Sequence, residues 1–282
     1  MSLQYENLCY VKDLLRSHSG MVLDDSKEYL VENRLMPLAA NAGFTKLDDF
    51  IAHIRKVPGY SSEHSLVVES MTINETFFFR DQYCFEALRK SILPEIIENR
   101  REMRRLRIWS AASSTGQEAY SIAILLYDIF PEIIDWNIEI MGTDLSRAAV
   151  EKARAGVYSL SEIKRGLTQD QIDRHFTRSG NTWKINQNLK KNIAFTCINL
   201  CEPFSYMDQF DIVFLRNVLI YFDQETKREI TRKVGSCVAS DGFLILGTGE
   251  STMFIDPIWD QISYDRFTAY RHQQQQGVSS HY

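Results

Sequence analysis

Two acidic side chains, Glu118 and Asp144, occupy positions where ligand-binding residues of parallel sheets stand. Glu118 closes the loop after a short apolar stretch at 107–112, and Asp144 follows a second apolar stretch at 136–143. The first loop contains one glycine, Gly116, so the Gly-x-Gly-x-x-Gly signature of dinucleotide-binding proteins is absent. Because carboxylates suit ribose hydroxyls and a cationic group better than a phosphate, we expect a nucleoside ligand that carries a positive charge.

A third apolar stretch, at 210–215, is followed directly by Arg216 and Asn217 and then by the aromatic residue Tyr221. Carboxylates without a phosphate cradle fit S-adenosylmethionine, which combines an adenosine, an amino-acid end and a sulfonium cation. The spacing therefore predicts a methyltransferase. A second interpretation of Asp144 stays open, because its side chain also suits the N-cap of the helix that follows it.

The elements that position these residues alternate between strand and helix from about residue 106 onward, which is typical of an α/β fold with a parallel sheet. Residues 1–75 carry only helical periodicity, which predicts a small helical bundle whose second helix begins after Asp24, Asp25 and Ser26. Between 158 and 192 the alternation lapses. The short stretches 182–185 and 192–196 predict an antiparallel insert, and the polar end, 273–282, predicts disorder.

Composition excludes several classes of protein. The formal charge of −5 over 282 residues argues against a nucleic-acid binder, which needs a basic surface. An odd, scattered set of five cysteines indicates a reducing compartment, and we interpret Cys197 and Cys201 as buried apolar residues without a metal. The N-terminus lacks the features of a signal peptide, and no apolar stretch approaches the roughly 20 residues that a membrane span needs. We therefore expect a cytoplasmic protein.

Four segments of the chain resemble the CheR-type chemotaxis receptor glutamate O-methyltransferases, and the similarity extends over about residues 5–270. They are SMTINETFFFRD at 70–81, WSAASSTGQEAYS at 109–121, GTD at 142–144 and FLRNVLIYF at 214–222. The resemblance implies a Rossmann-like methyltransferase domain at 91–272 with a small antiparallel β insert at about 158–192. It also implies an all-helical domain at 1–75 and a linker at 76–90 that contributes to the cofactor site.

The resemblance also implies which residues contact S-adenosyl-L-methionine and its product S-adenosyl-L-homocysteine. It moves the strand at 193–198 from the insert into the main sheet, where Asn199 reaches the adenine amino edge. Glu118 holds the methionine ammonium and Asp144 the ribose, and no metal is expected. The implied cofactor contacts are Asn74, Thr76, Arg80, Glu118, Asp144, Asn199, Leu200, Arg216 and Asn217.

The implied reaction is methyl transfer to a glutamate carboxylate, which is already ionised at neutral pH and needs no general base. Arg80 is the candidate that orients this carboxylate, because a guanidinium pairs bidentately with it. Tyr221 is the second candidate, as a hydrogen-bond donor near the methyl group. Alternatives stay open for both: a surface ion pair of Arg80 with Asp81 or Glu75, and a Tyr221 ring packed under its loop.

The implied partners are methyl-accepting chemotaxis receptors, acidic helical bundles that alone connect the enzyme to the membrane. Residues 1–72 hold seven Lys or Arg against ten Asp or Glu, so a basic docking patch there is small. The insert loop at 177–183 is short, and no binding of a receptor C-terminal tether is expected. We interpret the basic run from Arg100 to Arg107 as a solvated helix face and turn. The alternatives are a carboxyl methyltransferase for a non-chemotaxis signalling protein or a small acid, and a binding module without catalysis.

Overall fold

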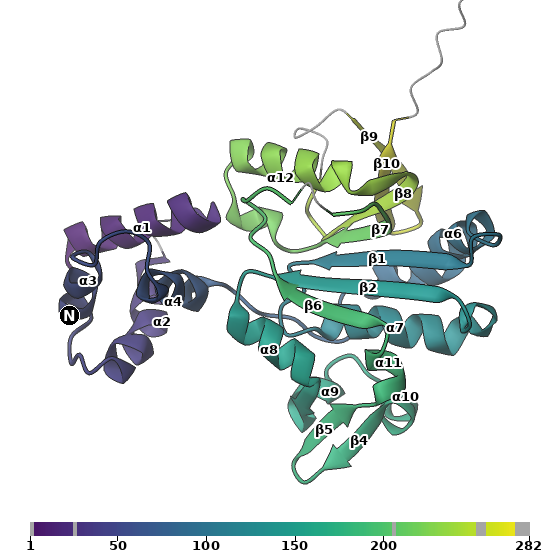
Figure 1. The fold of residues 1–282 in the computed structure, drawn as a ribbon, viewed down its shortest axis with the longest axis horizontal. Helices are drawn as coiled ribbons and strands as arrows, with labels where there is room; N and C mark the ends of the chain where they lie inside the picture. The colour runs from purple at the N-terminus through teal and green to yellow at the C-terminus, as the bar shows by residue number, and fades with distance from the viewer. Residues whose placement is uncertain (1–2, 25–26, 205–206, 252–257, 274–282) are drawn as a thin grey trace, which may run out of the picture.

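The computed structural model describes residues 3–24, 27–204, 207–251 and 258–273. Figure 1 shows a helical unit at one end of the molecule, a central sheet with helices on both faces, and a small antiparallel unit beside α8. These three parts are the helical domain, the Rossmann-like domain and the insert that the sequence predicts. None of the described helices is long and apolar enough to cross a membrane.

The helical domain buries one apolar stripe from each of its four helices. Val11 and Leu15 pack against Val31 and Leu35, all four at 1% exposure or less. The second helix begins at Glu28, slightly later than its predicted start, and two of the residues proposed to cap it lie outside the described residues. The helices are α1 (Tyr5–Ser19), α2 (Glu28–Asn41), α3 (Leu47–Ile54) and α4 (Ser62–Met71).

The main sheet has the strand order β6-β2-β1-β7-β8-β10-β9. The strands β6, β2, β1, β7 and β8 pair in parallel, and β10 is antiparallel to both β8 and β9. The strands are β1 (Arg105–Ala111), β2 (Asn137–Asp144), β6 (Ile193–Cys197), β7 (Phe210–Leu215), β8 (Val238–Leu246), β9 (Trp259–Tyr264) and β10 (Phe267–His272). Because the order reverses between β1 and β7, loops diverge there at the carboxyl ends of the strands, which is where such sheets bind ligands.

Two apolar clusters cover the two faces of the sheet. Successive residues of β7 alternate between them, since Ile212 and Phe214 belong to one cluster and Val213 and Leu215 to the other. The first cluster includes residues of α5 (Gln82–Ala87), η2 (Leu88–Ile92), α6 (Leu93–Asn99), α7 (Gln117–Ile129) and α8 (Arg147–Ala155), and the second includes residues of α12 (Gln224–Ser236). A strand buried on both faces needs the continuous apolar sequence that β7 has.

The insert is a three-stranded antiparallel sheet with short helices around it. Its strand order is β3-β5-β4, and the two residues Gly180 and Asn181 connect β4 to β5. The elements are β3 (Val157–Ser159), α9 (Leu160–Lys164), α10 (Gln169–His175), β4 (Phe176–Ser179), β5 (Thr182–Ile185) and α11 (Gln187–Lys190).

Three expectations about local structure need correction, and one pair of strands was not expected. The residue pattern alone assigned 192–196 to the insert, but β6 pairs with β2 in the main sheet, as the resemblance implied. The hairpin of β9 and β10 was not predicted. Arg100 is 9% exposed rather than solvated, because its Nε lies 2.6 Å from Asp211. Cys197 is exposed and Cys201 is half-buried, so neither is a fully buried apolar cysteine.

Candidate active site

A cleft lies at the carboxyl ends of β1, β2 and β7, on the side of the sheet where Figure 1 shows the helical domain. It encloses about 930 Å³, including the part that is open to solvent, which is within the usual range for a small-molecule site. Ser19 and Met21 of the helical domain also line it. The structure brings every predicted site residue to this cleft: Asn74, Thr76, Arg80, Glu118, Asp144, Asn199, Leu200, Arg216, Asn217 and Tyr221.

Glu118, in the first turn of α7, is held by two side chains. Its Oε1 accepts a hydrogen bond from Ser110 Oγ at 2.7 Å, and its Oε2 accepts one from Arg216 Nη1 at 2.8 Å. Arg216 is 5% exposed, and its Nη2 donates to Asp81 Oδ2 at 2.6 Å and to the main-chain oxygen of Arg80 at 2.8 Å. Arg216 therefore holds the Glu118 carboxylate in place, and both residues line the cleft.

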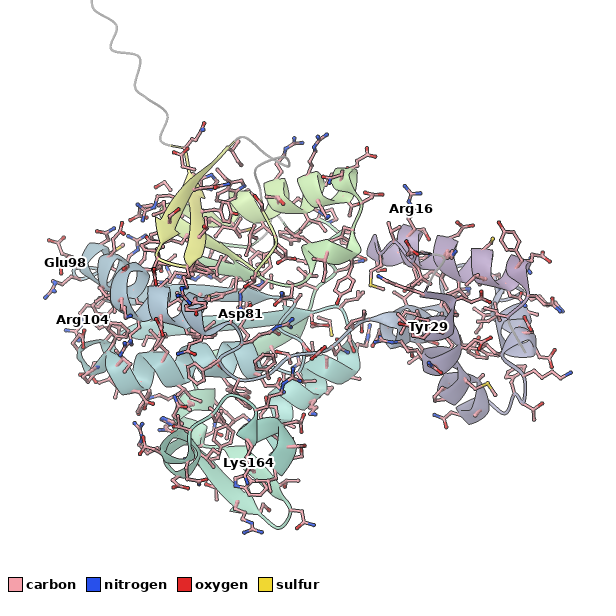
Figure 2. All side chains as sticks on the ribbon, turned by 180° about the vertical axis from the view of Figure 1, so that it is seen from behind. Arg16, Tyr29, Asp81, Glu98, Arg104 and Lys164 are labelled. Atoms are coloured by element: carbon pink, nitrogen blue, oxygen red, sulfur yellow. The ribbon has the colours of Figure 1, made fainter. Side chains whose placement is uncertain are left out.

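Asp81 is a site residue that the sequence reasoning did not select. Figure 2 labels it near the centre of the molecule, where residues 72–81, here called the crossing segment, pass from the helical domain to the sheet. Asp81 does not line the cleft, but its carboxylate pairs with Arg216. Its position next to Arg80, within one of the four segments that resemble the family, was the available signal.

Asp144 is 7% exposed and is held by the main chain. Its Oδ2 accepts from Ser114 N at 2.8 Å and its Oδ1 from Ser146 N at 2.9 Å. The N-cap of α8 is Ser146, whose Oγ accepts from Ala149 N, so the interpretation of Asp144 as the cap is wrong. Burial raises the pKa of Asp144 above its ordinary value, and the main-chain N–H groups oppose that shift. Two hydrogen bonds leave lone pairs on this carboxylate for further donors.

Asn217 is held in a left-handed conformation with φ 58°. Its main-chain N–H donates to Glu250 Oε2 at 2.7 Å, and Gly247 N donates to the same oxygen at 2.8 Å. Glu250 is a second residue that the sequence reasoning did not select. This carboxylate therefore sets the backbone at Asn217, beside the cleft.

Most of the non-glycine residues with positive φ lie in or near the cleft. Of the seven non-glycine residues with positive φ among those described, three line the cleft and two flank Arg80. Such conformations are costly and cluster at functional sites, because the surrounding structure must hold them in place. The five residues are Ala112, Ser114 and Asn217 in the lining, and Phe79 and Asp81 beside Arg80.

The crossing segment closes one side of the cleft. The main-chain oxygen of Asn74 accepts from Ser114 Oγ at 2.9 Å, which fixes the segment over the loop after β1. Arg80 Nη1 donates to the main-chain oxygen of Glu75 at 2.8 Å. The carboxylate of Glu75 pairs with Arg165 and that of Asp81 with Arg216, so the surface ion pair considered for Arg80 is not what the structure has.

Asn199 connects the two domains at the far side of the cleft. Its Nδ2 donates to the main-chain oxygen of His18 at 2.7 Å, and its Oδ1 accepts from Cys201 N at 3.0 Å. Tyr221 contributes to the same junction, because its main-chain oxygen accepts from Val22 N at 2.9 Å. Burial raises the pKa of the half-buried Tyr221 phenol, so the group is protonated and able to donate at neutral pH.

Other side chains of types that often act in catalysis lie outside the cleft. His175 Nε2 is 2.8 Å from Asp128 Oδ1 in a buried pair, but neither residue lines the cleft. Burial raises the pKa of the Cys84 thiol to about 12, so this thiol is neutral at ordinary pH. Within the described residues, no group of three or more His, Cys, Asp or Glu side chains is arranged to hold a metal ion.

Comparison with known proteins agrees with this geometry over both domains. Residues 6–72 match the model of the CheR methyltransferase all-alpha domain, and residues 74–265 match that of the CheR methyltransferase SAM binding domain. A chemotaxis protein methyltransferase of Vibrio parahaemolyticus is 39% identical over 84% of this chain and 86% of its own length. Chemotaxis protein methyltransferase 1 of Pseudomonas aeruginosa is 37% identical over 84% of this chain and 87% of its own. The chain therefore belongs to the CheR methyltransferase family.

Proposed function

We propose that this protein transfers a methyl group from S-adenosylmethionine to glutamate side-chain carboxylates of a chemoreceptor in the cytoplasm. The observation that supports this most directly is that one cleft gathers all ten residues selected from the sequence. Family membership and relatives named as chemotaxis protein methyltransferases support the same function. The product is a glutamyl methyl ester on the receptor.

The side chains of the cleft fit the cofactor. Glu118 offers a carboxylate for the methionine ammonium, and Asp144 keeps lone pairs for the ribose hydroxyls. Ser113 Oγ, in the cleft lining, is buried without a hydrogen-bond partner among the described residues and is available to a ligand. We assign Asn199 and Leu200 to the adenine. Asn74, Thr76, Arg80, Arg216 and Asn217 complete the set of proposed cofactor contacts.

The proposed mechanism depends on position rather than on acid–base catalysis. The chemistry that bound S-adenosylmethionine supplies is an electrophilic methyl group on a sulfonium, whose transfer to a carboxylate oxygen exchanges a C–S bond for a C–O bond, moves no proton and yields S-adenosylhomocysteine. Arg80 orients the receptor carboxylate, and the Tyr221 phenol donates a hydrogen bond beside it. Correct alignment of two reactants alone contributes about 7 kcal/mol or more to such a reaction.

We propose contact with the receptor at the cleft and at a small patch of the helical domain, where α2 contributes Arg34 as its one arginine. The two-residue turn between β4 and β5 gives the insert a tight hairpin end. A long loop able to grip a receptor tether does not fit there, so we propose docking without a tether. No nucleic acid is expected as a partner.

The test is a transfer assay with tritiated S-adenosylmethionine and receptor-containing membranes, followed by alkaline release of methanol. We expect base-labile label on a receptor band, lost in Arg80→Ala and retained in Arg101→Ala, an exposed arginine paired with Glu98. Cofactor binding by calorimetry without receptor label would point to another carboxylate substrate. Absence of cofactor binding would contradict the enzyme assignment itself.

A further inference from the structure

Two arginines flank one aromatic ring at the edge of the cleft. The guanidinium carbon of Arg165 lies 4.2 Å from the centroid of the Phe77 ring, and that of Arg80 lies 5.7 Å from the same centroid. Phe77 and Arg80 belong to the crossing segment and line the cleft, whereas Arg165 follows α9 in the insert. The two cations are therefore separated by at most the sum of those two distances.

The insert is fixed against the crossing segment at this point. Gly166 has φ 106°, and a Cβ added to it would lie 1.8 Å from the main-chain oxygen of Phe78. Only glycine permits that approach, so Gly166 fixes the backbone next to Arg165 against the crossing segment. Figure 2 shows the neighbouring Lys164 on the insert.

Arg165 has a partner that an incoming carboxylate can replace. Its Nη2 lies 2.8 Å from Glu75 Oε1, and the two side chains are 53% and 63% exposed. An ion pair with this exposure contributes little stability, so exchange of Glu75 for another carboxylate has a small energetic cost. Glu75 thus occupies the position that an acidic group of a bound protein would take.

The charge distribution favours this side of the cleft for an acidic partner. Residues 147–192, from α8 through the insert, hold ten Lys or Arg against four Asp or Glu, the reverse of the balance in residues 1–72. Complementary potential steers the encounter of two proteins and selects their orientation. An acidic segment is therefore attracted more strongly toward Arg165 than toward the helical domain as a whole.

We propose that Arg165 is a specificity-determining residue that binds a second carboxylate of the acidic segment whose first carboxylate accepts the methyl group, in exchange for Glu75. This inference rests on the proposed function and names the recognition that it requires. If the segment is helical, the upper limit on the distance between the two arginines covers one turn of about 5.4 Å but is shorter than two turns. The second acid then lies three or four residues from the methylated one.

The test is a kinetic titration with a purified cytoplasmic fragment of a chemoreceptor from the organism that encodes this chain. Arg165→Ala is expected to raise KM for the fragment about fivefold, with kcat and the calorimetric Kd for S-adenosylmethionine unchanged. Arg165→Lys keeps the charge and is expected to restore part of the loss. Arg178→Ala is the matched control, since Arg178 also stacks on an insert aromatic, Trp183, and is expected to leave KM unchanged.

Glu75→Gln separates recognition from simple packing. Removal of the competing carboxylate is expected to lower KM, opposite in sign to Arg165→Ala. If the ion pair only joined the insert to the crossing segment, both substitutions would raise KM, and that result overturns the inference. An unchanged KM in Arg165→Ala overturns it as well.

Receptor variants locate the second acid. Replacement of an acidic residue three or four positions from the methylated glutamate by its amide is expected to raise KM with wild-type enzyme and to cause no further rise of KM in Arg165→Ala. Full additivity at both positions contradicts the pairing. A fragment that wild-type enzyme leaves unlabelled contradicts the proposed function instead, and with it this inference.

Discussion

The Nη1 atom of Arg216 lies 2.8 Å from Oε2 of Glu118, and the buried guanidinium joins that carboxylate to Asp81 in a chain of three charged groups. Glu118 thus presents its remaining lone pairs to the cleft from a fixed position. A carboxylate fixed in this way loses little freedom when it binds a cation, which favours affinity for the cofactor.

Arg216→Lys is expected to weaken binding of S-adenosylmethionine by about tenfold to a hundredfold, because lysine cannot replace both charged hydrogen bonds. Asp81→Asn is expected to weaken it less, since Asp81 acts through Arg216. Isothermal titration calorimetry measures both effects. Arg101→Lys, in an exposed pair with Glu98, is the control. Binding by Arg216→Lys within threefold of wild type would contradict the arrangement.

The affinity for the cofactor is expected to fall on acidification because of Asp144. Burial raises the pKa of this carboxyl above 3.8, so it gains its proton at a higher pH than an ordinary aspartate does. Affinity is complete above the raised pKa and is lost as pH falls through it. Calorimetric Kd values over an acid pH series, with circular dichroism to monitor folding, measure this. Asp144→Asn should bind the cofactor weakly, and its affinity should not fall at low pH. A pH profile of the affinity identical to that of wild type would exclude Asp144 as the cause of the fall.

Gly20→Ala is expected to disturb the junction between the domains. A Cβ at Gly20, where φ is 70°, would lie 2.5 Å from Cys201 Sγ, whereas Gly59 has φ 69° and open space around the same position. Both substitutions incur the backbone cost of about 1–2 kcal/mol, but only Gly20→Ala adds a clash of about 1–3 kcal/mol. Urea unfolding gives the free energy of unfolding of each variant, and the difference between the two losses is the cost of the clash. Equal losses would show that the junction relaxes around the new methyl group.

Arg100→Met is expected to reduce the free energy of unfolding by about 3–5 kcal/mol, because it leaves the buried Asp211 carboxylate without its cation. Arg100 precedes β1 and lies at the opposite end of that strand from the cleft, so the cofactor Kd should not change. Urea unfolding and calorimetry measure the two quantities. The control is Arg101→Met, whose side chain is 70% exposed. A stability equal to wild type would mean that packing compensates for the lost charge.

The buried strands and the residues at their carboxyl ends could be predicted because the relevant signals are local. Apolar runs such as β7 mark strands buried on both faces, and the residue after each strand is known once the strand is placed. Arg216 follows β7 directly, Asp144 ends β2 and Glu118 lies in the first turn of the helix after β1, so all three could be located once the strands were placed. The site residues of the crossing segment could be predicted only from the family resemblance, because the sequence pattern of 72–81 does not indicate that this segment lies over the cleft.

The remaining features depend on contacts between residues distant in the sequence. β6 pairs only with β2 in the main sheet and leaves several side chains exposed, so its sequence is similar to that of a small antiparallel strand. The burial of Arg100 requires Asp211 and Asp241, which are more than one hundred residues further along the chain. Glu250 acts on the backbone at Asn217, a contact that no motif spacing reveals.

The last turn of α1 connects the folding of one domain to that of the other. The main-chain oxygens of His18 and Ser19 have no following helical turn to bond, and Asn199 Nδ2 and Cys201 Sγ, both from the sheet domain, donate to them. Separation of the domains would leave this helix end without those donors. Heating should therefore melt both domains in one cooperative step, with equal calorimetric and van't Hoff enthalpies.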